Sequence, residues 1–316
     1  MIKIDVLLAT YNGSKFVKEQ ITSVLANFDK LPGVNCRLLI SDDGSSDDTI
    51  AIINELELVD SRIILIDKTK KGGVRQNFNY LINNCDADYV FFCDQDDLWL
   101  PNKMSIFLDR FLLVEKDYSG PVLVHSDLCV ADKNLSPMNI SMFEYQKINK
   151  MPSFTELIIS NSITGCVMAC NRTLICEIKK SHISNSIMHD WYVGIYAAAY
   201  GRISFIDSSL ILYRQHGGNQ VGAKSFSTKD IFNFVGIKDK LADARLSVQK
   251  THEQAKLFYN DFGNDLEPNK RKDLHDYIDS FDTNFLCRLK LFSQRGFRKT
   301  GRLRNFIFFL VYILKI

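Results

Sequence analysis

The chain has 316 residues, of which 46% are hydrophobic and 24% are charged, and its formal net charge is +2. This composition argues against a disordered chain, which would be poor in apolar residues, and against a general nucleic-acid binder, which would be far more basic. The length suits one large α/β domain with an appendage, or two smaller domains.

The first hundred residues alternate short apolar runs with amphipathic stretches. The apolar runs predict buried strands, and the amphipathic stretches predict helices. We expect strands over 4–10, 36–43, 62–68 and 88–94, with helices between them over 14–28, 45–58 and 72–85. Strands separated by helices predict a mostly parallel sheet with helices on both faces.

The pattern changes after Pro101. We expect a strand over 121–132 and a strand or loop entering a helix over 162–178. We then expect a helix rich in small residues over 189–201, and two short strands ending in a polar loop over 202–219. From about Lys224 the sequence is charged and helical. We therefore expect a domain over 1–223 and a separate helical, basic region over 224–316.

The eight cysteines form no CxxC pair, and no histidine lies at the spacing of a zinc site. Most of them lie in apolar runs, where cysteine behaves as a small hydrophobic residue. The opening MIKIDVLLATYNGS has no basic head, long apolar stretch or small-residue cleavage site. Free thiols without a secretory signal predict a cytoplasmic location.

The end of the chain combines a basic segment with a short apolar run. The run 306–314 is far shorter than the roughly 20 residues that a membrane-spanning helix needs. Five basic residues precede it: Arg295, Arg298, Lys299, Arg302 and Arg304. We therefore expect a helix on an anionic membrane surface; the alternative is a helix packed on the core with a solvated basic flank.

Polar clusters follow three of the predicted strands. They are Thr10-Tyr11-Asn12, Asp42-Asp43-Gly44-Ser45 and Asp94-Gln95-Asp96-Asp97. In open parallel sheets, ligands bind outside the carboxyl ends of the strands. These clusters therefore predict a ligand site at one edge of the sheet.

The sequence YVFFCDQDDLWLPNK, Tyr89–Lys103, places three carboxylates within four positions at the end of an apolar strand. Like charges held together cost free energy unless a cation lies among them. The D-x-D pair, Asp94 and Asp96, offers two hard oxygen ligands that suit Mg²⁺ or Mn²⁺ holding a phosphate. The alternative is a solvated acidic turn.

The segment SDDGSSDD has both a structural and a functional interpretation. Ser45 or Ser46 can cap the following helix, whose first turn would hold Asp47 and Asp48. Asp42 and Asp43 precede the turn glycine. A carboxylate there can accept hydrogen bonds from a pyrimidine base or from a ribose.

Two later segments carry further candidates. Asp190 in MHDW is either a helix N-cap or a general base whose pKa is raised by its surroundings. Arg214 and His216 in YRQHGGN lie on a glycine loop, from which they can reach a phosphate or a metal. For His216 the alternative is a purely structural role.

With these residues identified, residues 3–222 resemble the inverting family 2 glycosyltransferases of GT-A fold. The motifs LLATYNGSKFVKEQITSVL, ISDDGSSDDT, GGVRQNFN, FFCDQDDLWLPNK, TGCVMACNR and MHDWYVGI occur in the family's order and rough spacing. MHDW followed by LYRQHGGNQVGA looks most like the bacterial branch that includes rhamnosyltransferases.

The resemblance implies a role for each matching residue. The nucleotide-sugar donor would be bound by Thr10, Tyr11, Asn12, Asp42, Arg75, Asp94 and Arg214. The metal, Mg²⁺ or Mn²⁺, would be held by Asp94, Asp96 and His216. Asp190 would be the catalytic base, with His189 where many members have Glu. The QxxRW motif of processive members is absent, which favours single-sugar transfer.

The resemblance also implies the reaction. Asp190 would remove a proton from an acceptor hydroxyl, which would attack the anomeric carbon opposite the diphosphate. We expect one sugar, rhamnose or similar, to move from dTDP-rhamnose or a UDP-sugar to a surface-polysaccharide or lipid-linked acceptor. The enzyme would lie on the inner face of the cell membrane. The alternatives are a non-catalytic nucleotide-sugar binding protein and a metal-dependent phosphohydrolase.

Overall fold

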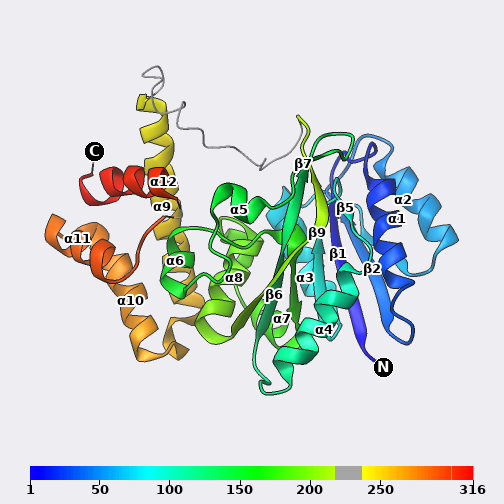
Figure 1. Cartoon of the computed structure of the whole chain (residues 1–316), viewed down its shortest axis with the longest axis horizontal. Coiled ribbons are helices and arrows are strands. Elements are labelled where there is room, and N and C mark those ends of the chain that lie inside the picture. The colour runs from blue at the N-terminus through cyan, green and yellow to red at the C-terminus, as the bar shows by residue number, and fades with distance from the viewer. Residues whose placement is uncertain (218–236, 300, 316) are drawn as a thin grey trace.

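The computed structural model describes residues 1–217, 237–299 and 301–315. Within them, nine strands form one sheet in the order β3-β2-β1-β4-β8-β6-β9-β5, with β7 paired to β6 (Figure 1). The strands are β1 Lys3–Thr10, β2 Asn35–Asp42, β3 Ile63–Asp67, β4 Tyr89–Cys93, β5 Leu98–Trp99, β6 Val122–Ala131, β7 Pro137–Asn139, β8 Met168–Asn171 and β9 Arg202–Arg214.

Helices cover both faces of this sheet and form the C-terminal region at one end of the molecule (Figure 1). They are α1 Val17–Phe28, α2 Thr49–Val59, α3 Val74–Asn84, α4 Lys103–Glu115, α5 Met142–Gln146, α6 Phe154–Ile159, α7 Arg172–Ile178, α8 His189–Tyr200, α9 Ile237–Phe262, α10 Pro268–Asp279, α11 Phe285–Gln294 and α12 Arg302–Phe308. The predicted GT-A-type α/β fold with a helical C-terminal region is confirmed.

The four predicted N-terminal strands are present and parallel. β1 pairs with both β2 and β4, and β2 pairs with β3. Thr10 lies beside Asp42 in the register, and Leu8 lies beside Cys93, the last residue of β4. The polar segments that follow β1, β2 and β4 therefore leave the sheet at one edge, as predicted.

The second half of the sheet differs from the prediction in two ways. β8 lies antiparallel between β4 and β6, so the sheet is mixed. The residues expected to form two short strands form one long strand, β9, which runs parallel to β6. Register shifts on either side of Asp127 accommodate the irregularity, because a β-bulge lets one strand carry extra residues without ending the pairing.

The start of α2 also differs from the prediction. The helix begins at Thr49, after all four Asp and Ser residues of the SSDD segment, and none of their side chains caps it at the N-cap position. Ser45 instead donates from its backbone N–H and its hydroxyl to Asp42, both at 2.7 Å. Asp47 accepts from the backbone N–H groups of Ser14 and Thr49. Ser45 therefore stabilises the loop at the sheet edge, whereas Asp47 joins that loop to the first residue of α2.

Side chains of successive strand residues enter two separate cores. In β1, Leu7 packs in the core that includes α3, α6 and α8, whereas Val6 and Leu8 pack in the core that includes α1 and α4. This alternation follows from the pleat of a strand. The sheet is therefore buried on both faces, and its edge is where polar groups can meet solvent.

The C-terminal helices share a core with the sheet domain. Phe258 of α9 and Tyr277 of α10 belong to the same hydrophobic cluster as Leu157 of α6 and Tyr192 of α8. The predicted boundary between residues 223 and 224 lies outside the described residues. Because of the shared core, we describe 237–315 as a region that is packed on the sheet domain.

The apolar end of the chain is largely buried. Phe308, Val311, Tyr312 and Ile313 have at most 7% of their surface exposed, whereas Phe306 is 59% exposed. This packing corresponds to the alternative interpretation of the sequence, in which the C-terminal helix packs on the core. No helix in the described part of the chain is long and apolar enough to cross a membrane.

The close approach of α8 to β6 gives a stability prediction. A Cβ at Gly201 would lie 2.3 Å from the carbonyl oxygen of Pro121, a backbone atom that cannot move aside cheaply. We expect Gly201→Ala to lower the free energy of unfolding by about 1–3 kcal/mol. Urea unfolding measures this. Gly217→Ala is the control, since nothing lies within 4 Å of its Cβ position; equal stability of the two variants would contradict the packing described.

Candidate active site

The first part of the site is formed by the ends of β1 and β2. Thr10 donates from its hydroxyl to Asp42 at 2.7 Å, and both side chains are buried. Tyr11 is 53% exposed, and its backbone N–H and C=O are bound by the side-chain amide of Gln95 at 2.9 and 3.0 Å. Asn12 accepts from the backbone N–H of Ser46 at 2.9 Å. The predicted donor residues of β1 and β2 thus lie together, and Gln95 joins them to the D-x-D loop.

The second part is the glycine loop before α3. Asp43 accepts backbone N–H bonds from Lys71, Gly72 and Gly73, so its carboxylate is fully engaged by this loop. Gly72 and Gly73 have φ values of 95° and 117°, which side-chain-bearing residues rarely adopt. Asp43 was a candidate for base or ribose binding; in the structure it shapes the loop that starts α3.

Arg75 lies in the first turn of α3. Its guanidinium donates to the backbone carbonyl of Ser186, in the segment that leads into α8. The predicted contact with the donor stays a prediction. The observed bond links the two sides of the site, because it connects the helix after the glycine loop with the segment that carries Asp190.

The D-x-D loop follows β4 and brings three predicted residues together. Asp96 lies 2.8 Å from Nε2 of His216, and both side chains are partly exposed. Burial, with the negative charges of Asp96 and Asp190, raises the pKa of Asp94 to about 7. The influence of Asp190 on Asp94 indicates that the predicted base lies near the predicted metal ligand Asp94.

Asp97 occupies the interior of the same loop. Its side chain is fully buried, one carboxylate oxygen accepts from the backbone N–H of Arg214 at 3.1 Å, and the other has no hydrogen-bond partner. Burial raises its pKa well above the ordinary value, and the charges of Asp96 and Asp94 add to the effect. An uncompensated carboxylate at this position would be costly.

The compensating charge comes from Lys103, which our sequence analysis did not single out. Its side chain is fully buried in the first turn of α4, with Nζ 2.7 Å from the carbonyl oxygen of Cys166 and 3.6 Å from the centre of the Trp99 ring. Burial lowers its pKa to about 8, while the negative charges of Asp97 and Asp94 oppose that shift. A lysine at the start of a helix, where acids are preferred, is the signal that could have drawn attention to it.

Arg214 is buried and holds the loop from the other side. Its guanidinium donates to the carbonyl of Asp96 at 2.8 Å, to the carbonyl of Lys133 at 2.8 Å and to the carboxylate of Glu19 at 2.5 Å. All three acceptors belong to the protein itself, and they hold the guanidinium of Arg214 in place. The predicted phosphate contact remains a prediction, and the observed role of Arg214 is to position the D-x-D loop.

Asp190 lies in the first turn of α8, across the site from the loop. The N-cap is Met188, so the alternative that Asp190 caps the helix was wrong. Its carboxylate accepts from the backbone N–H of Trp191 at 2.6 Å and of Gly165 at 3.0 Å, and from the Asn161 amide at 3.3 Å. Burial nevertheless raises its pKa to about 6. A carboxylate with this pKa is ionised at neutral pH and is a stronger base than an exposed one.

His189 does not share the charge of Asp190. Its ring stacks on Phe78 at a centroid distance of 3.9 Å and lies 5.6 Å from Phe92, and neither ring nitrogen has a hydrogen-bond partner. Burial lowers its pKa to about 3, so the ring is neutral. A Cβ at Gly165 would lie 3.1 Å from its Nε2, so Gly165 allows the close packing. Asp190 is the one carboxylate in the sequence MHDW, and the neutral ring of His189 places no charge beside it.

The residues fit a divalent cation. Among the described residues, ligand atoms of Asp94, Asp97 and Cys166 lie within 4.8 Å of one another. Asp96 and His216, which were predicted as ligands, are not part of this group. Carboxylate oxygens such as those of Asp94, Asp96 and Asp97 are the hard donors that Mg²⁺ or Mn²⁺ prefers, whereas the sulfur of Cys166 is a softer donor.

The buried lysine gives the second prediction. Lys103→Met leaves the carboxylates of Asp94 and Asp97 without their nearest cation, so we expect the free energy of unfolding to fall by about 3 kcal/mol. Chemical denaturation measures the change. Lys116→Met, at an exposed position just after α4, is the matched control. If the two variants were equally stable, Lys103 would not compensate these carboxylates.

Comparison with known proteins identifies the family of this chain. A family model described as glycosyl transferase family 2 matches residues 5–178. The dTDP-rhamnosyl transferase RfbG of Shigella flexneri is 32% identical over 238 residues, which cover 70% of this chain and 76% of that protein. The glucosyltransferase WfgD of Escherichia coli, which acts on α-D-GlcNAc-diphosphoundecaprenol, is 26% identical over 54% of this chain and 61% of its own length.

A solved structure shows the same fold. The mannosyltransferase PcManGT of Pyrobaculum calidifontis, in complex with GDP-Man and Mn²⁺, has a TM-score of 0.52 at 13% identity, over 90% of this chain and 71% of that one. The family model, the relatives and the fold agree with one another. The chain belongs to glycosyl transferase family 2 and is a glycosyltransferase that acts on nucleotide-sugar donors.

Proposed function

We propose that this protein is a metal-dependent, inverting glycosyltransferase that moves one sugar, rhamnose or similar, to a hydroxyl of a lipid-linked or surface-polysaccharide acceptor. The observation that carries the proposal is the position of Asp190, a buried carboxylate with a pKa of about 6, opposite the D-x-D loop. The rhamnosyl transferase RfbG supports the choice of sugar. WfgD, whose acceptor is a saccharide on diphosphoundecaprenol, supports the choice of acceptor.

In this mechanism the donor lies along the ends of β1, β2 and β4. Thr10, Asn12 and Asp42 would form the nucleotide pocket, and the exposed ring of Tyr11 offers a surface for the base. Asp94 and Asp96, with His216, would hold a divalent cation, which would neutralise the charge that develops on the leaving diphosphate.

The acceptor side is provided by α8. Asp190 takes the proton of the acceptor hydroxyl as the oxygen forms its bond to the anomeric carbon. The bond between that carbon and the diphosphate oxygen breaks, and the electron pair leaves with the nucleotide diphosphate. The backbone N–H of Gly165 and the amide of Asn161 hold the carboxylate in place. Attack from the face opposite the diphosphate inverts the configuration.

The alternatives fit the site less well. A phosphohydrolase of the D-x-D type carries Thr or Val after the motif, whereas Asp97 and Leu98 follow it here. A binding protein would need no base, and the buried carboxylate of Asp190 would then be a cost without a use. The glycosyltransferase proposal accounts for Asp190 as the base.

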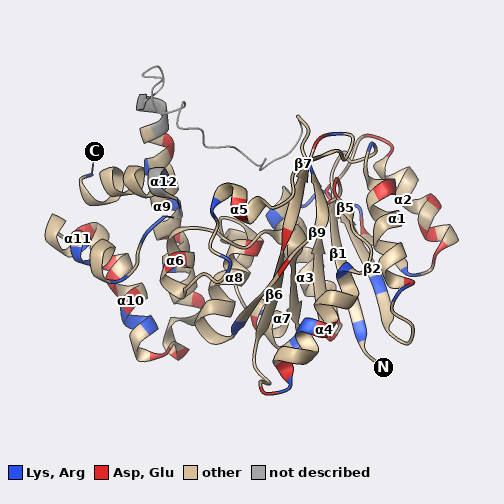
Figure 2. Ribbon diagram, in the orientation of Figure 1, with Lys and Arg blue, Asp and Glu red and all other residues tan. Residues whose placement is uncertain are grey.

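A position on the inner face of the cell membrane remains part of the proposal. It is supported by the lipid-linked acceptor of WfgD and by the exposed Phe306. The contact is smaller than a helix lying in the surface, because most of the apolar run is buried. Arg295 also forms ion pairs with Asp273 and Asp276 of α10, whose acidic and basic residues are intermingled (Figure 2).

The role of Asp190 is tested by Asp190→Asn. We expect transfer to fall by about 10²–10⁴-fold with donor affinity unchanged, because the amide cannot accept the proton. The measurement is transfer from dTDP-rhamnose or a UDP-sugar to a lipid-linked GlcNAc diphosphate, with donor binding followed by calorimetry. Turnover close to that of the wild type would remove Asp190 from the mechanism.

The pH dependence follows from the same residue. The base is active only when ionised, and burial places its pKa at about 6. We therefore expect kcat/KM to rise about tenfold per pH unit below pH 6 and to level off above it. A profile of the wild type from pH 4.5 to about 8 measures this. A profile that is flat through pH 6 would contradict the assignment.

Metal-dependent donor binding is tested by Asp96→Ala. We expect the donor affinity measured by calorimetry in the presence of Mn²⁺ to fall at least about tenfold, while binding without metal stays the same. Asp109→Ala is the control, because Asp109 is exposed on α4 away from the loop. Equal affinities of the two variants in Mn²⁺ would exclude Asp96 as a ligand.

A further inference from the structure

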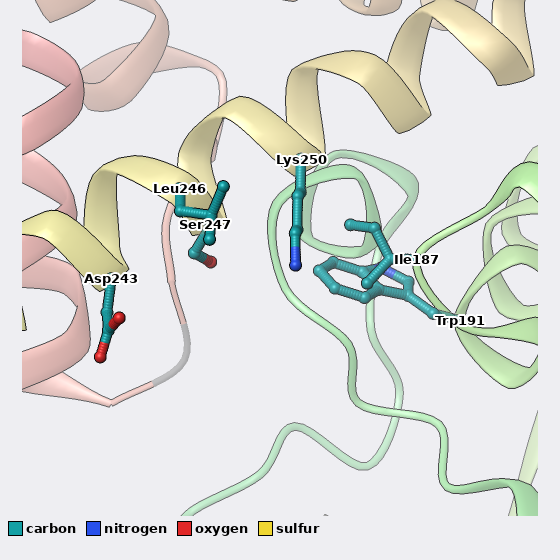
Figure 3. Close-up of a pocket in the computed structure, with 6 residues that line it drawn as sticks. All are labelled: Ile187, Trp191, Asp243, Leu246, Ser247 and Lys250. Carbon is teal, nitrogen blue, oxygen red and sulfur yellow. The ribbon is translucent and has the colours of Figure 1, made fainter. Parts of the chain in front are cut away.

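A pocket lies between the start of α8 and the helix α9 of the C-terminal region. Its volume is about 220 Å³, and Figure 3 shows the residues that line it: Ile187, Trp191, Asp243, Leu246, Ser247 and Lys250. Trp191 directly follows Asp190 in the chain, and Ile187 lies just before α8 begins. The pocket is therefore lined by the chain segment that carries the proposed base, on the side formed by α9.

The indole of Trp191 is fixed in place. Its Nε1 donates to the carbonyl oxygen of Leu157 at 2.5 Å, and only 9% of the residue is exposed. The segment before α8 is also tied to α9, because the backbone N–H of Ile187 donates to the Gln254 amide oxygen at 2.8 Å. A fixed aromatic ring at a pocket wall offers a flat apolar surface, of the kind on which the C–H face of a sugar can rest.

The lining of the pocket contains one lysine and one aspartate, and a second lysine lies close by. Lys250 is exposed, and its ammonium points towards the Trp191 ring (Figure 3). Lys299 is half-buried, with Nζ 5.9 Å from the centre of that ring and 3.4 Å from the hydroxyl of Ser247. Neither lysine forms an ion pair with a carboxylate of the described residues. Asp243, the acidic residue among those that line the pocket, lies at the far end from Lys250 in Figure 3.

A second positive charge lies near Lys299. Burial and, to a smaller extent, the positive charge of Arg304 together lower the pKa of Lys299 to about 8. An ammonium group beside another positive charge becomes more stable when an anion binds. Phosphate, which accepts several charge-assisted hydrogen bonds, is the anion best suited to two lysines.

We propose that this pocket is an acceptor subsite that binds a phosphorylated sugar, with the sugar against Trp191 and its phosphate or diphosphate between Lys250 and Lys299. The inference rests on the proposed function and deepens it, since it gives α9 the role of recognising the acceptor. The same chemistry is found in a soluble sugar phosphate and in a lipid-linked one.

The test uses intrinsic fluorescence, because the chain has two tryptophans, Trp99 and Trp191. Trp99 is buried beneath the D-x-D loop, so a ligand in the pocket acts on Trp191. The full chain is titrated with GlcNAc 1-phosphate in EDTA without nucleotide, which keeps a metal-bound donor out of the measurement. We expect a saturable change with GlcNAc 1-phosphate and none with unphosphorylated GlcNAc at the same concentrations.

The matched variants are Lys250→Glu and Lys256→Glu, both exposed positions on α9. We expect Lys250→Glu to weaken binding by about tenfold or more, because it replaces a charge-assisted contact by repulsion, and Lys256→Glu to bind like the wild type. Equal affinities of the two variants, or an equal response to unphosphorylated GlcNAc, would overturn the proposal. Neither the fluorescence titration nor the comparison of the two variants depends on catalysis. The subsite proposal can therefore fail while the transferase proposal stands, and the transferase proposal can fail while the subsite proposal stands.

A second arm separates the two sources of the ligand. GlcNAc diphosphate carrying a lipid chain, in detergent micelles, is titrated beside the soluble sugar phosphate, with empty micelles as the blank. Tighter binding of the lipid-linked form that is lost in Lys250→Glu supports the subsite with a lipid-linked acceptor. Equal binding of both forms, also lost in Lys250→Glu, supports it with a soluble acceptor. Binding of either form that persists in Lys250→Glu contradicts it.

Discussion

The geometry of this site depends on the compensation of buried negative charge under the D-x-D loop. Asp97 is fully buried, and like charges lie on either side of it at Asp94 and Asp96. The buried ammonium of Lys103 faces the cluster from α4, and Arg214 binds the loop from the end of β9. Without these cations the loop would lower its energy by turning its carboxylates towards water. The outward position of Asp96 therefore depends on residues that hold the loop from behind.

The opposite wall uses burial in a different way. Asp190 is nearly enclosed, and the hydrogen bonds from Gly165 and Asn161 only partly offset the cost of its charge. His189 packs between aromatic rings and stays neutral, so it does not stabilise the carboxylate by charge. The result is a base of moderate strength at a fixed position. The two walls thus have opposite electrostatics: one gathers charge for a cation, and the other keeps one carboxylate ready to accept a proton.

The C-terminal region completes the second wall. Its apolar end turns inward, with Phe308 and Tyr312 stacked at 4.8 Å, and the same packing holds α9 against α8. This arrangement brings Lys299 from the basic segment to the ring of Trp191. A segment whose sequence is typical of a helix on a membrane surface therefore contributes to the interior and to the pocket between α8 and α9. The donor side and the acceptor side that we propose are thus built by different parts of the chain.

The sequence by itself determined the N-terminal half of the fold and the residues of the donor side. Regular alternation of apolar and amphipathic runs predicts β1 to β4 because a parallel strand buried on both faces must be apolar throughout, and the motifs then follow at the strand ends. The roles of the D-x-D pair and of Asp190 are predictions drawn from the residue types and from the resemblance to a known family, and the structure brings Asp94 and Asp190 near one another.

Only the tertiary structure decided the antiparallel insertion of β8, the single long strand β9, the inward packing of the chain's end and the roles of Lys103 and Arg214. Each of these depends on contacts between residues that are far apart in the chain, and a local pattern carries no information about them. A lysine in the first turn of a helix, or five basic residues before an apolar run, has the same appearance whether it meets water or a buried carboxylate. The physical environment that distinguishes the two cases exists only after the chain has folded.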